Sequence, residues 1–268
     1  MTFDDLTEVE RDRLLVAKVF TYQYENLSDA EVLEIFSRLN KYSVALNAQE
    51  LRNGKFFGQF ISTSSDLSHE TLEFWRSTRI FTEQAIARMQ DIQLVSELLI
   101  CQMDGLQDKK ASIDAYCAWL DEEWGEDAPA RGAKLNSSRL RYLSKDESID
   151  RYRRTITAIG DSVGNELRTS AFNRAPLFYT LYSVMYHYLF GLPGFDVDPA
   201  QDLDGEHFTS AFRESLLELS EALNAKGEAD FVDPQVAQFI TASSQQTDNV
   251  QPREVRARVL WNRTVHGR

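Results

Sequence analysis

Residues 35–54, IFSRLNKYSVALNAQELRNG, hold a high density of hydrogen-bonding side chains around one bend. Arg38 and Asn40 precede the bend, and Gln49, Glu50, Arg52 and Asn53 follow it. An asparagine side chain both donates and accepts hydrogen bonds, and an arginine offers a charged fork that suits phosphate. These residues are candidates for substrate binding, since they suit the orienting of a phosphate or of a neighbouring loop, with Gln49 and Glu50 holding Arg38 and Arg52 in place.

A purely structural interpretation fits part of the same pattern. Asn40 would end one helix in a left-handed conformation and Asn47 would cap the next, which gives an αα-hairpin. This accounts for the two asparagines but not for the charges beside them. A DNA-reading helix-turn-helix fits less well, because its second helix, AQELRNG, has one basic residue.

Arginines gather in two further segments. Five lie between residues 139 and 154, and five more lie between Arg253 and Arg268, where there is one glutamate. In an acidic protein such clusters favour either a phosphate-contacting surface or internal ion pairs. The phosphate-contact candidates in the second segment are Arg253, Arg256 and Arg258.

Other residues that commonly do chemistry are scattered. The four histidines (His69, His187, His207 and His266) are too far apart in sequence for a local metal cluster, so no metal ligands are predicted. Cys101 and Cys117 lie among apolar residues and are predicted to be buried thiols. No phosphate loop, GxGxxG, GxSxG or HExxH motif occurs.

Composition narrows the function classes. The net charge of −13 over 268 residues opposes general affinity for nucleic acid or anionic membrane, although a local basic patch could still contact DNA. Two cysteines without zinc-like spacing predict a cytoplasmic protein. The segment 175–192 lacks charged residues, but its four tyrosines favour a buried core helix over a membrane span.

The elements that must position these residues are nearly all helical. Leu14–Tyr24 alternates apolar residues at period two and predicts one β-strand. Helix signals follow in both arms of the hairpin and in the ranges 69–80, 82–90, 91–103, 109–123, 145–168, 175–190, 206–225, 234–243 and 252–264. A lone strand leaves unpaired backbone groups, so it is predicted to pair with a partner chain or a second copy.

The motif FxRLN, then LxxQELRN, resembles the N-terminal domain family of GmrSD-type restriction endonucleases, a ParB/sulfiredoxin-like group. Here it reads Phe36 to Asn40 and Leu46 to Asn53. The resemblance implies a mainly α fold in which 1–60 is a remnant of an α/β ParB-like domain, comprising the strand and the hairpin, and 61–268 is a helical domain. It also implies family-motif site residues at Phe36 and Asn40.

The resemblance further implies a nucleotide-dependent DNA-processing protein of bacterial defence. The family's DGQQR-type stretch does not occur in this sequence, so the chain is expected to be catalytically incomplete alone. A ParB-like partner would complete it, with a nucleoside triphosphate and Mg²⁺ as cofactors. Two alternatives stay open: a non-catalytic helical module that docks a partner protein, and a nucleic-acid binder that uses the arginine-rich tail.

Overall fold

The computed structural model describes residues 46–120, 123–127, 138–197, 204–225 and 233–267, and eight scattered residues before them (Thr7, Arg11, Leu15, Val16, Ser28, Glu31, Val32 and Ile35). The chain divides into two compact units, Met1–Leu46 and Asn47–Arg268. The second arm of the predicted hairpin thus groups with the helical unit, whereas the sequence interpretation placed the boundary at residue 60.

The described residues of the first unit contain no strand. Within the predicted strand, Leu15 is helical and Val16 lies in a turn, which is at odds with the prediction there, and the rest of that segment lies outside the described residues. The backbone N–H of Ser28 donates to the Glu31 carboxylate at 2.9 Å, a contact typical of a capping box. Phe36, Arg38 and Asn40 also lie outside the described residues.

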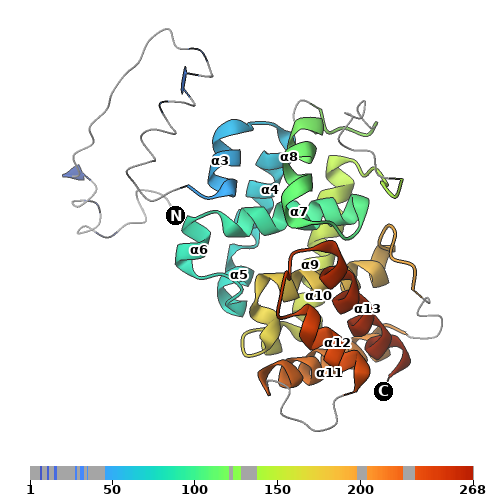
Figure 1. Ribbon diagram of the computed structural model, residues 1–268. Coiled ribbons are helices and arrows are strands. Elements are labelled where there is room, and N and C mark those ends of the chain that lie inside the picture. The colour runs from blue at the N-terminus through green and yellow to red at the C-terminus, as the bar shows by residue number, and fades with distance from the viewer. Residues whose placement is uncertain are drawn as a thin grey trace. The chain divides into compact units, whose positions relative to one another are not determined.

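The second unit is built from helices, as the sequence predicts (Figure 1). They are α3 (Ala48–Lys55), α4 (Gln59–Glu70), α5 (Leu72–Thr78), α6 (Glu83–Ala87), α7 (Gln90–Asp104), α8 (Lys109–Trp119), α9 (Lys145–Leu167), the 3₁₀ turn η2 (Ala171–Asn173), α10 (Ala175–Phe190), α11 (Gly205–Asn224), α12 (Pro234–Ala242) and α13 (Val250–His266).

Local signals fix most helix ends. Ser144 accepts a hydrogen bond from the N–H of Glu147 at the start of α9, and Asp233 caps α12 with Pro234 in its first turn. The end of α7 falls at Gly105, where φ is +72°, a value that glycine adopts without steric cost. These ends agree with the predicted helix ranges 145–168, 234–243 and 91–103 to within one or two residues.

One helix was missed. The sequence predicts a helix from residue 69, but α4 begins ten residues earlier, at Gln59. Its segment QFISTSSDLSHE is rich in serine and threonine, which favour turns because their hydroxyls compete for backbone groups. Here the Ser64 hydroxyl donates to the Phe60 carbonyl at 2.9 Å, and α4 buries Phe60 and Leu67 against the core.

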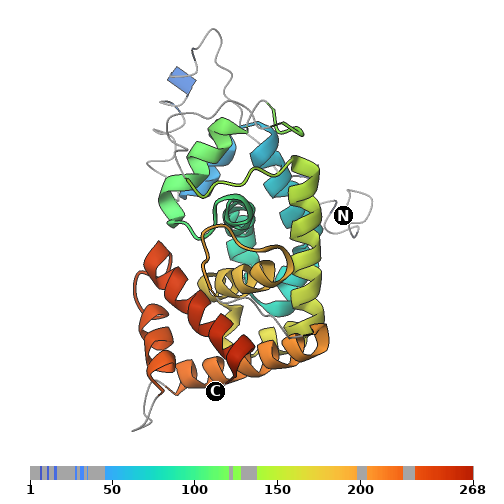
Figure 2. The same ribbon diagram turned by 90° about the vertical axis from the view of Figure 1, so that its right-hand side faces the viewer.

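The core forms around α10, which packs against α7, α9 and α13. Tyr182, Val184, Met185 and Tyr186 are 0–2% exposed, which confirms the predicted central buried helix. Figure 2 views α7 nearly end-on, with other helices of the unit around it. Within the described ranges, no helix has both the length and the apolar character needed to cross a membrane.

Candidate functional site

The polar residues that follow the bend build the contact between α3 and the rest of the helical unit. Asn47 accepts from the N–H groups of Gln49 and Glu50, and the Glu50 carboxylate accepts from the N–H of Asn47, which completes a capping box. The Asn47 amide also donates to the Arg88 carbonyl at 2.7 Å. The predicted cap is confirmed, and it carries a long-range contact that sequence spacing could not show.

Gln49 and Arg52 lie on the inner side of α3. Gln49 is fully buried, donates to Asn53 at 3.0 Å and accepts from Arg52 at 3.1 Å. Arg52 is 9% exposed, and its Nε lies 2.5 Å from the Asp114 carboxylate of α8. Gln49 therefore does hold Arg52, as predicted, but the pair faces a neighbouring helix in place of a substrate.

Glu50 is paired with a different arginine from those in the motif. Its carboxylate accepts from the Arg88 guanidinium at 3.0 Å, and only 13% of its side chain is exposed. The substrate-binding candidates Gln49, Glu50, Arg52 and Asn53 thus all have intramolecular partners. This arrangement assigns them a positioning role in the described unit.

A separate pocket of about 200 Å³ lies between α7, α10 and α13. Its polar residues come from three places in the chain: Gln90, Gln93 and Glu97 from α7, Asp248 from the loop before α13, and Arg253 from α13. Asn47 at the start of α3 also borders it. The distant sequence positions explain why sequence spacing gave no sign of this site.

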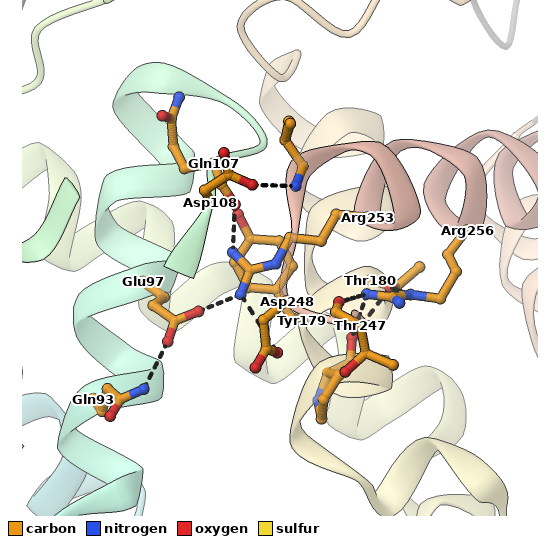
Figure 3. Close-up of polar contacts among 12 residues, drawn as sticks. Gln93, Glu97, Gln107, Asp108, Tyr179, Thr180, Thr247, Asp248, Arg253 and Arg256 are labelled. Carbon is orange, nitrogen blue, oxygen red and sulfur yellow. Dashed lines mark hydrogen bonds and ion pairs between the residues drawn. The ribbon is translucent and has the colours of Figure 1, made fainter. Parts of the chain in front are cut away.

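Arg253 lines this pocket, and its polar contacts are drawn in Figure 3. It is 2% exposed, pairs with the buried Glu97 carboxylate and donates to the Gln107 carbonyl at 2.8 Å. Its guanidinium also stacks on the Tyr179 ring, 3.8 Å from the centroid. Burial lowers the pKa of Arg253, but Tyr179 and Glu97 raise it by more, so the side chain stays charged.

The predicted phosphate contacts at Arg253 and Arg256 are not supported, because both side chains are buried. Arg256 is 0% exposed and donates to Thr180 and to the carbonyls of Ala242 and Thr247 (Figure 3). Burial lowers the pKa of Arg256 to about 10, which leaves it charged at neutral pH. The alternative of internal ion pairs and hydrogen bonds describes these arginines better than a basic surface does.

Arg258 is the most exposed of the three predicted phosphate contacts. Its side chain is 40% exposed, pairs with Glu254 one turn earlier at 2.9 Å and donates to the Asp196 carbonyl at 2.9 Å. In the other arginine segment, Arg151 pairs with Glu147, Arg153 with Glu70 and Arg154 with Asp150. These three arginines of the 139–154 segment therefore have carboxylate partners, as the ion-pair interpretation predicts.

The remaining candidates from the sequence have structural surroundings. His187 accepts from the Leu192 N–H at 3.1 Å, and its ring meets Trp261 edge-on at a centroid distance of 4.5 Å. Burial lowers the pKa of His187 to about 4. Cys101 and Cys117 are buried free thiols, as predicted. Among the residues that the structure describes, no group of three His, Cys, Asp or Glu side chains could hold a metal ion.

Searches found no matching family model, no similar curated protein and no similar solved structure at the significance required.

Proposed function

We propose that this chain is the helical part of a GmrSD-like, nucleotide-dependent DNA-processing protein of bacterial defence. In this proposal the chain works with a ParB-like partner that supplies the DGQQR-type stretch, and the completed site binds a nucleoside triphosphate and Mg²⁺ as cofactors. Phe36, Arg38 and Asn40 form this chain's side of the composite site. The proposal rests on the motif quoted above and on what its second half does in the structure.

The observation that carries the proposal is the attachment of α3. The polar residues of LNAQELRN have defined contacts. The cap Asn47 contacts Arg88, and the site candidates pair as Glu50 with Arg88, Arg52 with Asp114, and Gln49 with Asn53 inside α3. These contacts hold α3, the helix that follows the first arm of the motif in the sequence, against α8 and the end of α6. A site on that arm needs such an anchor, because loosely held groups give little catalysis.

The partner is to be sought in the reading frames beside this gene, as an open frame that encodes a ParB-like segment ending in DGQQR. The full chain and that partner are co-expressed, and the purified mixture is assayed for ATP and GTP hydrolysis and for nicking of modified and unmodified DNA with Mg²⁺. We expect turnover by the complex and a loss of about 100-fold or more in Asn40→Ala, the range seen when one transition-state donor is removed.

Asn224→Ala is the matched control, because Asn224 is exposed at the end of α11. It should leave turnover unchanged. A stable complex without turnover, or equal turnover in both variants, would overturn the enzymatic proposal.

The second candidate is a non-catalytic interaction module, which exposed apolar side chains near α3 favour. Phe57 is 82% exposed and Leu51 is 51% exposed. If docking alone is the function, Phe57→Ser should abolish binding of the ParB-like partner without changing the stability of this chain, while the wild-type complex shows no turnover. Normal binding by Phe57→Ser would exclude this face as the docking surface.

A further inference from the structure

The pocket between α7, α10 and α13 is rich in hydrogen-bond acceptors. The Glu97 carboxylate and the Asp248 carboxylate line it from opposite elements. Gln93 donates its amide hydrogen to Glu97 at 3.1 Å, which directs its carbonyl oxygen away from that carboxylate. An ionised carboxylate accepts only, and its two oxygens offer about four acceptor positions.

The positive charge in the pocket is already engaged. Arg253 directs its guanidinium donors to Glu97 and to the Gln107 carbonyl, with Asp248 4.0 Å away. Arg256 does not line the pocket, and it donates to Thr180 and to three backbone carbonyls. The Nε–H of Arg253 is buried and has no hydrogen-bond partner among the described residues, but an incoming anion would meet the Glu97 and Asp248 carboxylates beside it.

Part of the pocket wall is apolar and the space is small. Phe81, Leu94, Ala175 and Pro176 supply this wall. The volume of about 200 Å³ is below the roughly 300–1,000 Å³ of sites for drug-sized ligands. A ligand that fits must be short, must offer donors at one end, and must carry methylene groups that can lie against the apolar wall.

We infer that this pocket binds a small organic cation, namely an alkyl chain that ends in an ammonium or guanidinium group. The charged end donates to Asp248, Glu97 and the Gln93 carbonyl, and the alkyl chain contacts Phe81 and Leu94. Charge-assisted hydrogen bonds of this kind are stronger than neutral ones. The inference stands independently of the proposed DNA-processing function, because it uses none of the residues assigned to that function.

Agmatine and putrescine are the probes, and binding to the purified full chain is measured by isothermal titration calorimetry and by thermal shift. We expect saturable binding of both cations. Butane-1,4-diol, which has the length of putrescine without its charge, and inorganic phosphate should not bind. The same titrations are repeated with Asp248→Asn and Gln93→Ala.

Asp248→Asn should weaken agmatine binding about tenfold or more, since a hydrogen bond to a charged group is lost. Asp161→Asn is the matched control, because Asp161 is exposed on α9 and lies outside the pocket. The agmatine affinity of this variant should stay within about twofold of the wild-type value. These substitutions leave the Glu97–Arg253 pair intact, so the variants are expected to fold. Absence of cation binding, equal binding of the diol or phosphate, or equal losses in both aspartate variants would overturn the inference.

Discussion

Arg253 illustrates how a single residue can be misassigned when its neighbours in space are unknown. The sequence around it reads as a basic tail, yet the side chain lies inside the unit, between Glu97 and the Tyr179 ring. Glu97 is 156 positions away in the chain, so no local spacing could reveal the pair. The sequence leaves two alternatives for such arginines, surface charge and internal ion pairs. Its 42 acidic residues supply carboxylates for internal pairs.

Removal of Glu97 should be severely destabilising, because it leaves a buried guanidinium without its counter-ion. We expect Glu97→Ala to lower the free energy of unfolding by about 3–5 kcal/mol, the usual cost of breaking a buried pair from one side. Urea unfolding followed by tryptophan fluorescence reports on the helical unit, because this unit contains all four tryptophans (Trp75, Trp119, Trp124 and Trp261).

Glu70→Ala is the control for this experiment. Glu70 pairs with Arg153 at 2.7 Å, but the two side chains are 44% and 55% exposed. Exposed pairs contribute about 1 kcal/mol or less. Similar losses in the two variants would mean that the Glu97–Arg253 pair is not buried in solution.

His187 should make the stability of the helical unit depend on pH. Its folded pKa of about 4 lies below the ordinary 6.5, so between these values the unfolded chain binds more protons than the folded one. The contribution is fully present above pH 6.5 and is lost as the pH falls toward 4, by up to about 3 kcal/mol.

The measurement is the free energy of urea unfolding between pH 7 and pH 4.5. Carboxylates also titrate in this window, so the informative quantity is the difference between variants. His187→Gln should reduce the loss of stability on acidification. His207→Gln removes a histidine whose side chain is 76% exposed and should keep the wild-type dependence. The burial argument fails if both variants follow the wild-type curve.

At the scale of helices, the signals that are local in sequence predicted most of the described fold. The predicted ranges 145–168 and 234–243 match α9 and α12 to within one residue at each end. The failure at α4 has a physical cause, because serine and threonine oppose helix formation until tertiary packing of Phe60 compensates. Contacts between helices, such as Arg52 with Asp114, were beyond sequence analysis because they depend on which faces meet.

Two glycines in helical segments should respond to alanine in opposite directions. Gly105 ends α7 at φ +72°, and a Cβ there would lie 2.1 Å from the Pro193 carbonyl oxygen. Gly105→Ala should therefore destabilise the unit by more than the roughly 1–3 kcal/mol of a strained backbone alone. Gly164 lies within α9 with nothing within 4 Å of its added Cβ, so Gly164→Ala should stabilise by about 0.5–1 kcal/mol.

Thermal and urea unfolding of the two alanine variants beside wild type measures this difference. If Gly105→Ala leaves the free energy of unfolding unchanged, Gly105 lies farther from the Pro193 carbonyl in solution than in the structure. Destabilisation by Gly164→Ala would show that this face of α9 is covered in solution.

At the scale of the whole molecule, the acidic charge and the burial of arginines act together. The net charge is −13, and the α13 arginines at 253, 256 and 263 are 0–6% exposed, with their guanidinium groups engaged inside the helical unit. In the described part of the tail, these three arginines therefore offer little guanidinium surface for the third alternative, which is DNA binding. Phosphate binding depends on exposed cations that release counter-ions from DNA.

We accordingly expect the full chain alone to bind duplex DNA weakly, with little dependence on salt. The affinity for a labelled duplex is measured by fluorescence anisotropy between 50 and 200 mM salt, a range over which a protein with roughly 6–10 phosphate contacts loses about 10³–10⁵ in affinity. Arg258→Ala removes the most exposed of the three predicted phosphate contacts. Its control is Arg76→Ala, because Arg76 is 45% exposed and pairs with Glu83. Tight binding with a steep salt slope that Arg258→Ala reduces and Arg76→Ala does not would restore the tail as a DNA contact. Flat, weak binding by all three proteins leaves DNA recognition to the partner chain, where the proposed function already places the DGQQR-type stretch.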